Sequence, residues 1–371
     1  MKVLLLTWDF PPGRGGIQTW MLELARRLPD AQVRVLAPAV PGDRLFDAAS
    51  GCQVTRLRNA RFGRIPWMLQ LCVRTLRECL LWRPDVVVCG HVMTAPAALF
   101  ARRVLSTPYV VFTYGQEIRR QRWKRLLTFL LPRARLVVAC SRFTRSAVLD
   151  LAVPPERVRI LYPGVDVQRF SPASDGTSHT RPRTLLTVAR LADLWKGHDT
   201  VIRALPLIRA ECPDVRYLVA GDGPLRNYLE QVARSVGVER DVVLLGEVSD
   251  QALGDLYRSC DVFVLPSRRS ASDGDAEGFG IVCLEAGACA KPVVAGRSGG
   301  IVDAVQDNVS GILVDPADVA AVADAIISVL RDQSLAKRLG EAGREMVLAR
   351  FTWDRVVGEA RNVFAEAAGL Q

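Results

Sequence analysis

Histidine is scarce in this sequence, and the cysteines are not arranged for metal or disulfide chemistry. The three histidines, His91, His179 and His198, include no pair with the spacing of zinc ligands. The nine cysteines are scattered without a CxxC pair, which favours reduced thiols packed as small core residues. We therefore expect neither a metal site nor a disulfide framework.

Long apolar runs are missing as well. No stretch of about 18 uninterrupted apolar residues occurs, so no transmembrane helix is expected. The apolar start Met1–Thr7 gives way to Trp8-Asp9, too early for a signal peptide with a small-residue cleavage site. The sequence therefore predicts a cytoplasmic protein.

The sequence does contain enough apolar material for two domains. Hydrophobic residues make up 49% of the 371 positions, and this length suits two domains of roughly 150–200 residues. The two halves of the chain differ in charge. Residues 1–170 hold 27 Lys/Arg and 11 Asp/Glu (net +16), whereas residues 171–371 hold 22 Lys/Arg and 28 Asp/Glu (net −6). The two halves are therefore expected to face different partners.

Short apolar runs alternate with helix-like segments in both halves, a pattern typical of parallel sheets buried on both faces. The polar stretch 171–182 separates the two rounds, and a long helical segment over 317–350 precedes a helical tail. We expect an α/β protein with two Rossmann-like, doubly wound domains, residues 1–168 and 169–352, facing a central cleft. The expected strands are Lys2–Thr7, Val33–Leu36, Val86–Cys89, Tyr109–Phe112, Leu136–Ala139, Thr184–Val188, Arg216–Ala220, Val242–Leu245, Val262–Leu265, Pro292–Ala295 and Gly311–Val314.

The densest group of candidate binding residues is Glu277-Gly278-Phe279-Gly280, followed by Glu285. A Gly-x-Gly turn at a helix start exposes backbone N–H groups to an anion. Both glutamates are expected on one helix, where eight residues separate them by about 12 Å. This is more than the roughly 5–9.5 Å of a glycosidase pair. They would suit two parts of an extended ligand, such as a sugar and a ribose. The alternative is one helix-start glutamate and one surface glutamate.

Other candidates follow the ends of expected strands. Arg190 and Lys196 follow the first strand of the second half, where two cations suit a diphosphate, although a solvated basic loop is the alternative. His91 and Glu117 follow two successive strands of the first half and are expected in the cleft, although a lone histidine is often structural.

The glycine-rich loop Gly13-Arg14-Gly15-Gly16 does not match the dinucleotide fingerprint. Gln18 stands where a glycine is required, and no acidic residue ends the second strand, so nicotinamide binding is disfavoured. Paired glycines at a helix start still allow a sugar or phosphate to approach the backbone closely.

In their order and spacing, these motifs resemble the retaining GT-B glycosyltransferases of family 4 over nearly the whole chain. The loops Asp9-Phe10-Pro11-Pro12 and Tyr114-Gly115-Gln116-Glu117 look most like those of bacterial phosphatidylinositol mannosyltransferases. The other shared parts are Gly15-Gly16-Ile17, Pro163-Gly164-Val165-Asp166, Arg190 with Lys196, Gly221-Asp222-Gly223-Pro224, and Glu277 with Glu285.

The resemblance implies roles for individual residues. Arg190 and Lys196 would bind the donor diphosphate, while Glu277 would hold the donor sugar and His91 would contact it. The donor-binding set would also include Gly16, from across the cleft, and Gly246, Val248, Phe279, Gly280, Ile281 and Glu285, the last of these at the ribose. The acceptor-binding set would be Gln18, Tyr114 and Glu117. The C-terminal helix, about 353–371, would pack back onto the first domain.

The expected activity is transfer of a hexose, with mannose favoured, from a nucleoside-diphosphate sugar to an acceptor hydroxyl, with retention and without a metal. GDP-mannose is favoured over a UDP-hexose, no cofactor is expected, and the acceptor is expected to be lipid-linked or a glycan. Two other functions stay open: a nucleic-acid-binding protein that uses the basic N-terminal half, and a GT-B-like sugar-nucleotide epimerase. Few aromatic residues and no nucleic-acid motif argue against a nucleic-acid partner.

A basic segment suggests a location for this activity. Residues 119–125 carry five arginines and lysines beside Trp123, and Leu126–Leu131 follows them. The pattern predicts an amphipathic helix that lies on an anionic membrane, and hence an enzyme peripheral to the inner face of the cell membrane. The alternative is a solvated arginine-rich face.

Overall fold

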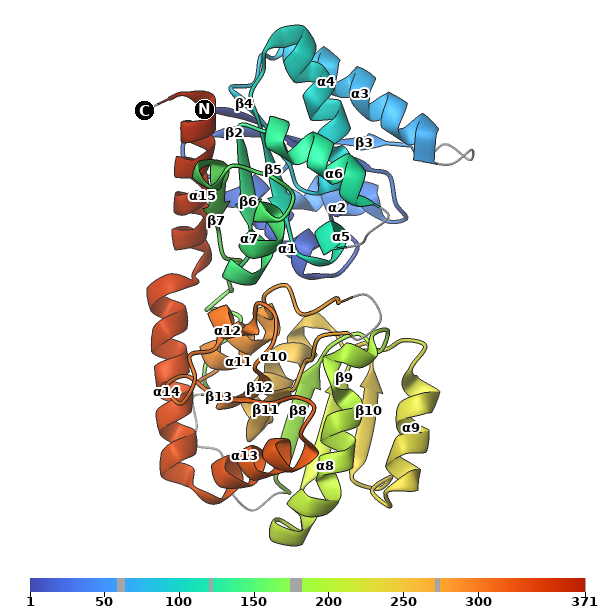
Figure 1. Ribbon diagram of the computed structural model, residues 1–371, viewed down its shortest axis with the longest axis vertical. Helices are drawn as coiled ribbons and strands as arrows, with labels where there is room; N and C mark the ends of the chain where they lie inside the picture. The colour runs from blue at the N-terminus through green and yellow to red at the C-terminus, as the bar shows by residue number, and fades with distance from the viewer. Residues whose placement is uncertain (59–63, 120–122, 174–181, 271–273, 371) are drawn as a thin grey trace. The chain divides into compact units, whose positions relative to one another are not determined.

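The computed structural model describes residues 1–58, 64–119, 123–173, 182–270 and 274–370. The chain divides into two compact units, Met1–Gly164 with Trp353–Gln371 and Val165–Thr352. The division falls after Gly164, a few residues before the boundary expected from the sequence. Each unit is built on a parallel sheet that helices cover on both faces (Figure 1).

The first unit contains a seven-stranded sheet in the order β3-β2-β1-β4-β5-β6-β7, in which all neighbours are parallel. All five strands expected here are present, but β3 and β7, which form the two edges, were not predicted. The strands are β1 (Lys2–Leu6), β2 (Gln32–Pro38), β3 (Gln53–Leu57), β4 (Val86–Cys89), β5 (Tyr109–Thr113), β6 (Leu136–Ala139) and β7 (Val158–Ile160).

The helices of the first unit include one layer, formed by α3, α4 and α6, whose buried residues share a core with β1, β4, β5 and β6. The C-terminal helix α15 contacts α1, β4 and β5 within the same unit. The helices are α1 (Gly16–Arg27), α2 (Asp43–Ser50), α3 (Arg64–Leu81), α4 (Ala95–Leu105), α5 (Gln116–Arg119), α6 (Lys124–Leu130), α7 (Arg142–Leu149) and α15 (Trp353–Ala368).

The basic segment expected to form one helix over 119–131 is divided in the structure. Helix α5 ends at Arg119, α6 runs from Lys124 to Leu130, and a 3₁₀ turn, η3, covers Leu131–Arg133. Three residues of the expected helix, 120–122, lie outside the described residues. The described part of this segment therefore supplies one helix of only seven residues.

The second unit contains a six-stranded parallel sheet in the order β10-β9-β8-β11-β12-β13. All six strands were expected: β8 (Thr184–Val188), β9 (Arg216–Ala220), β10 (Val242–Gly246), β11 (Val262–Leu265), β12 (Val293–Gly296) and β13 (Ile312–Val314). The helices are α8 (His198–Glu211), α9 (Arg226–Ser235), α10 (Asp250–Ser259), α11 (Ile281–Ala288), α12 (Ile301–Ala304), α13 (Val319–Arg331) and α14 (Gln333–Arg350), with a 3₁₀ turn η5 (Leu194–Lys196) before α8.

The long helix expected over 317–350 is two helices. Asp332 ends α13 and caps α14, because its carboxylate accepts the N–H of Leu335 at 2.9 Å. None of the helices in the described ranges is long and apolar enough to cross a membrane. All nine cysteines are free thiols, and six of them are buried.

Candidate active site

Two cations follow β8 at the carboxyl end of the second sheet. Arg190 is exposed, and its side chain has no ion-pair partner among the residues that the structure describes. Lys196 ends η5 and is 17% exposed. Gly197 closes this turn at φ +82°, and a Cβ there would collide with the carbonyl oxygen of Pro266 at the end of β11. Close packing of η5 on β11 therefore holds Lys196 at the edge of the sheet.

Lys196 Nζ donates to Glu277 Oε2, and the same ammonium lies 4.5 Å from the centre of the Trp195 ring. The Glu277 side chain is 15% exposed, so both charges are largely withdrawn from water. A partly buried ion pair of this kind holds both side chains in place. The structure thus brings together two residues that the sequence assigned to different parts of the donor.

The turn before α11 corrects one expectation from the sequence. Helix α11 begins only at Ile281, because Gly280, at φ +92°, caps it in the left-handed region. Glu277 therefore precedes the helix, and the prediction that both glutamates lie on one helix is wrong. The separation calculated along a single helix therefore does not apply. The first N–H groups of α11 have no partner within the helix and point toward the turn, which suits an anion.

Two neighbouring elements support this turn. The N–H of Gly300 donates to the carbonyl of Glu277 at 2.7 Å, and a Cβ on Gly300 would collide with the Gly278 carbonyl. Phe279 is buried, and its ring centre lies 5.9 Å from that of Phe351. The backbone at Glu277–Gly280 is thus fixed before any ligand arrives, as a binding site with preorganised amides requires.

Glu285 is half-buried on α11. Its Oε2 accepts the hydroxyl of Tyr257 at 2.7 Å, and burial raises the pKa of the carboxyl group. Tyr257 is itself buried on α10, with its ring 5.5 Å from Phe170. The sequence did not single out Tyr257, because an aromatic residue in a helix usually indicates only core packing.

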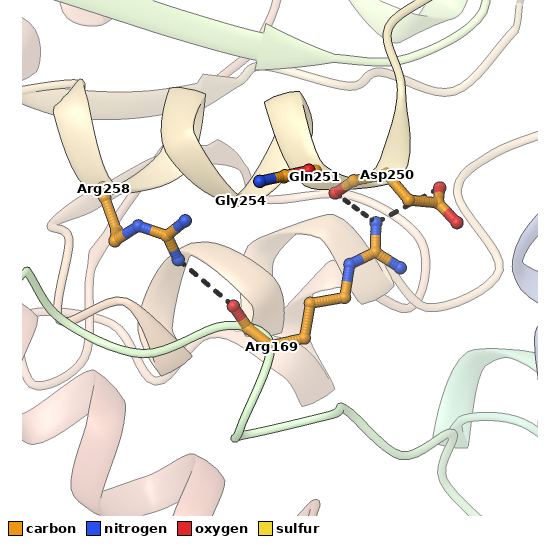
Figure 2. Close-up of a pocket in the computed structure, with 5 residues that line it drawn as sticks. All are labelled: Arg169, Asp250, Gln251, Gly254 and Arg258. Atoms are coloured by element: carbon orange, nitrogen blue, oxygen red, sulfur yellow. Dashed lines mark hydrogen bonds and ion pairs between the residues drawn. The ribbon is translucent and has the colours of Figure 1, made fainter.

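A pocket lined by polar residues borders α10 (Figure 2). Arg169 crosses it and donates to the backbone oxygen of Asp250 at 2.9 Å, with the Asp250 carboxylate 3.2 Å away. Both residues act electrostatically on Glu285. The pocket is lined by Arg169, Asp250, Gln251, Gly254 and Arg258. Gly246 ends β10, and Val248 lies in the short loop between β10 and α10.

Polar groups also gather at the carboxyl edge of the first sheet. Gln18, on α1, donates from Nε2 to Asp9 Oδ1 at 3.2 Å, and Asp9 follows β1. Gly16, the first residue of α1, is exposed. The sequence analysis named Asp9 only as part of a motif. Its position directly after a buried strand is the signal that could have identified it as a candidate site residue.

Tyr114 and Glu117 join this edge from the loop after β5. Glu117 Oε1 accepts the N–H of Tyr114 at 2.6 Å, and burial together with the nearby Asp9 carboxylate raises the pKa of Glu117 to about 7. The Tyr114 hydroxyl donates to the carbonyl of Gly90 at 2.8 Å, beside His91. The two loops expected to meet are therefore tied by a hydrogen bond.

His91 is placed as a neutral cap. Its Nδ1 accepts the N–H of Met93 at 3.1 Å, and burial lowers its pKa to about 4. The structural role, which the sequence left open as the alternative, is therefore present, and it leaves Nε2 for a second hydrogen bond.

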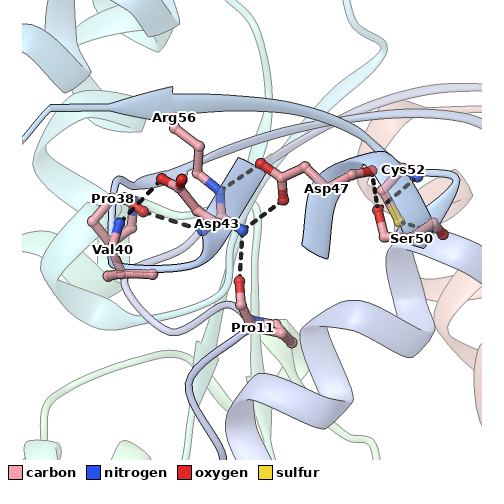
Figure 3. A network of polar contacts seen from close by, with 8 residues as sticks. All are labelled: Pro11, Pro38, Val40, Asp43, Asp47, Ser50, Cys52 and Arg56. Carbon is pink, nitrogen blue, oxygen red and sulfur yellow. Dashed lines mark hydrogen bonds and ion pairs between the residues drawn. The ribbon is translucent and has the colours of Figure 1, made fainter. Parts of the chain in front are cut away.

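A guanidinium anchors the loop that leads to Gly16 (Figure 3). Arg56, on β3, forms a two-point ion pair with Asp47 at 2.9 and 2.7 Å and donates to the carbonyls of Pro11 and Pro38. It also lies over the Phe10 ring, 5.4 Å from its centre. Arg56 was missed because neither its strand nor its partners could be recognised in the sequence.

Comparison with known proteins identifies the family to which this chain belongs. The family Glycosyl transferases group 1 matches residues 173–346, and Glycosyltransferase Family 4 matches residues 14–169. A GDP-mannose-dependent alpha-(1-6)-phosphatidylinositol monomannoside mannosyltransferase of Mycobacterium tuberculosis is 34% identical over 96% of both chains. The chain is a family 4 glycosyltransferase.

Other similar proteins support the same family and show the fold. The corresponding mannosyltransferase of Mycolicibacterium smegmatis is 34% identical over 95% of both chains. A glycosyltransferase from Rickettsia africae superimposes with a TM-score of 0.83 over 99% of this chain and 98% of its own, at 19% identity. HepE from Anabaena, solved with UDP and glucose, gives 0.81 over 98% and 99%, at 22% identity. The fold is therefore GT-B, as the motifs predicted. No group of three or more potential metal ligands occurs in the described part of this enzyme.

Proposed function

We propose that this glycosyltransferase transfers mannose from GDP-mannose to a hydroxyl group of a lipid-linked acceptor, with retention and without a metal ion. The observation that carries the proposal is the Lys196–Glu277 pair beside the turn before α11. It puts a cation, a carboxylate and helix-start amides in one place, matching a diphosphate joined to a sugar. The names of the relatives at 34% identity support the choice of donor.

In this proposal the protein cations stabilise the departing diphosphate. The bond between the anomeric carbon and the β-phosphate oxygen breaks, and negative charge develops on GDP. This charge is stabilised by the side chains of Arg190 and Lys196 and by the backbone amides of Phe279, Gly280 and Ile281. The acceptor oxygen bonds to the same face of the sugar, and its proton passes to the departing phosphate. Glu277 orients the sugar hydroxyls while it keeps Lys196 in place.

The pocket of Figure 2 would hold the nucleoside. Glu285 would bind the ribose hydroxyls, and Gly246 and Val248 would border the base. Guanine presents two neighbouring N–H donors on its Watson–Crick edge, which a carboxylate accepts well. The Asp250 side chain is 72% exposed and already placed by Arg169, so it supplies such a carboxylate.

The acceptor would lie at the polar edge of the first sheet. Gln18, Tyr114, Glu117 and neutral His91 offer hydrogen bonds to a polyol without a fixed cationic charge. The relatives named above act on a phosphatidylinositol mannoside. A lipid of that class would place this enzyme, as a cytoplasmic protein, at the inner face of the cell membrane.

The test measures transfer of labelled sugar from several nucleotide-sugar donors in the presence of EDTA. We expect GDP-mannose to label a lipid acceptor, UDP-hexoses to give much less product, and EDTA to leave the rate unchanged. Labelled product that requires a divalent cation would remove the metal-free mechanism. Epimerised sugar nucleotide formed without any acceptor would remove the transfer reaction itself.

A further inference from the structure

Arg268 follows β11 at the carboxyl edge of the second sheet, and its guanidinium binds the first turn of α8. It forms a two-point ion pair with Asp199, in which both N–O distances are 3.0 Å, and it also donates to the Thr200 hydroxyl at 3.0 Å. The Asp199 side chain is 14% exposed and that of Arg268 is 26% exposed, so the pair is largely withdrawn from water. Because a planar guanidinium bound at two points has little freedom, Arg268 fixes the position of this helix start.

The backbone of Arg268 holds the chain on the other side of Lys196. Its N–H donates to the carbonyl of Trp195 at 2.8 Å, and the hydroxyl of the buried Ser267 donates to the same carbonyl at 3.1 Å. Trp195 directly precedes Lys196, and Asp199 follows Lys196 by three residues. Arg268 therefore binds the chain both before and after the lysine.

The Lys196 side chain is long and flexible, so its placement depends on its neighbours. In the structure the ammonium contacts the Glu277 carboxylate and lies over the Trp195 ring. In the proposed donor complex Glu277 accepts hydrogen bonds from the sugar hydroxyls, and the Trp195 ring remains as the neighbour of the ammonium. Since the carbonyl of Trp195 is bound by Arg268, the placement of the ammonium in the loaded enzyme depends on Arg268.

The guanidinium of Arg268 is itself poorly suited to bind the donor. Both terminal nitrogens already donate to Asp199, whose negative charge balances that of Arg268. His198, at the same helix start, is neutral, because burial and the nearby Lys196 lower its pKa to about 4. The positive charge offered to a diphosphate therefore comes from Lys196 and Arg190.

We propose that Arg268 is a positioning residue of the donor site: it holds Trp195 and Asp199 so that the Lys196 ammonium meets the diphosphate while the bond to the sugar breaks. The inference rests on the proposed donor, and it gives Arg268 a part in the stabilisation of the leaving group through Lys196. The effect on rate should be large, since a misplacement of about 1 Å lowers a rate about 100-fold.

A purely structural role for Arg268 predicts a different result. Asp199 lies in the first turn of α8, where a carboxylate interacts favourably with the helix dipole, so its pair with Arg268 would then contribute to stability alone. Arg183 provides a matched control, because it precedes β8 and so lies at the amino edge of the same sheet. It pairs with Asp261 at 3.5 Å, and the two side chains are 30% and 21% exposed.

The test is a double-mutant cycle in the full chain, combined with GDP binding. The variants are Arg268→Gln, Lys196→Ala, the two together, and Arg183→Gln as the control. For each we measure kcat with GDP-mannose, the affinity for GDP by isothermal titration calorimetry, and the melting temperature. Arg268→Lys, which keeps the charge but cannot form the two-point pair, serves as a second variant if Arg268→Gln does not fold.

We expect Arg268→Gln to lower kcat about 10- to 100-fold and to weaken GDP binding at least about threefold. Arg183→Gln should lower the melting temperature comparably but change kcat and GDP affinity by less than about twofold. In the Lys196→Ala background Arg268→Gln should lower kcat by less than about threefold, because residues that act as one unit are not additive. Arg268→Lys should lose at least about threefold in kcat.

Wild-type kcat in Arg268→Gln, or in Arg268→Lys where the glutamine variant does not fold, overturns the positioning role. An equal loss of kcat with and without Lys196 also overturns it, since Arg268 would then act independently of the lysine. A similar loss of kcat in Arg183→Gln would attribute the effect to stability and overturn it as well. Failure of the proposed donor is recognised separately, because wild type itself would then fail to bind GDP or to turn over GDP-mannose.

Discussion

Lys196 and Glu277 form an ion pair although 81 positions separate them in the chain. The pair joins the loop after β8 to the turn before α11, and in the free enzyme each charge satisfies the other. Binding of a nucleotide sugar would break the ion pair. Lys196 would then contact the diphosphate, and Glu277 would accept hydrogen bonds from the sugar hydroxyls. The donor site is therefore preorganised by a contact that the donor replaces in part.

Replacing the two cations should have different effects on stability. Lys196→Ala leaves Glu277 largely buried without its partner, so we expect a lower melting temperature as well as a loss of at least about 100-fold in kcat. Arg190→Ala removes an exposed side chain, so we expect a similar loss of kcat with an unchanged melting temperature. Steady-state kinetics and calorimetry of both variants check this. Near-normal turnover in both would remove the assignment of the donor diphosphate.

Glu117 should make stability depend on pH. Its pKa is about 7 in the folded protein, above the roughly 4.3 of an unfolded glutamate. Between these values the folded state holds one proton more, so its contribution to the free energy of unfolding decreases as pH rises and levels off above pH 7. Going from pH 5 to pH 8, wild type should lose roughly 2 kcal/mol relative to Glu117→Gln. Urea unfolding of both proteins measures the difference, and equal pH dependence would contradict the burial of this carboxyl group.

Arg56 should contribute mainly through the loop that it anchors. Arg56→Ala leaves Asp47 unpaired and the carbonyls of Pro11 and Pro38 without their donor, at a cost of about 2–4 kcal/mol in unfolding free energy. Arg56→Lys should recover only part of this, since an ammonium cannot reproduce the two-point pair. Denaturant titration tests it, with Arg44→Ala on the exposed side of α2 as control. A control as unstable as Arg56→Ala would show that the network has no special role.

Asp250 should select the nucleotide base. If its carboxylate accepts from guanine, Asp250→Asn replaces an acceptor by a partial donor, and the kcat/KM ratio of GDP-mannose to UDP-hexose should fall about tenfold. Asp255→Asn, at an exposed acid of the same helix, is the control and should keep the wild-type ratio. An unchanged ratio in both variants would place base recognition elsewhere.

The sheets were predictable because each central strand contains a short run of mostly apolar residues. Strands β3 and β7 were not: Gln53–Leu57 alternates exposed and half-buried residues at a sheet edge, and Val158–Ile160 has only three residues. Motif order identified the family, but it could not show that Glu277 precedes its helix, which depends on the backbone of Gly280. The Lys196–Glu277 and Arg56–Asp47 ion pairs could not be predicted from the sequence either, because the packing of the fold, and not the spacing in the chain, brings the partners together.

The most direct test of the account is a transfer assay with labelled GDP-mannose, a phosphatidylinositol-containing lipid extract and EDTA, run on wild type and Lys196→Ala. The account predicts that wild type moves labelled mannose into the lipid fraction with its anomeric configuration retained, and that Lys196→Ala does so at least about 100-fold more slowly. Failure of GDP-mannose to label the lipid while a UDP-hexose does, or full activity in Lys196→Ala, would contradict it.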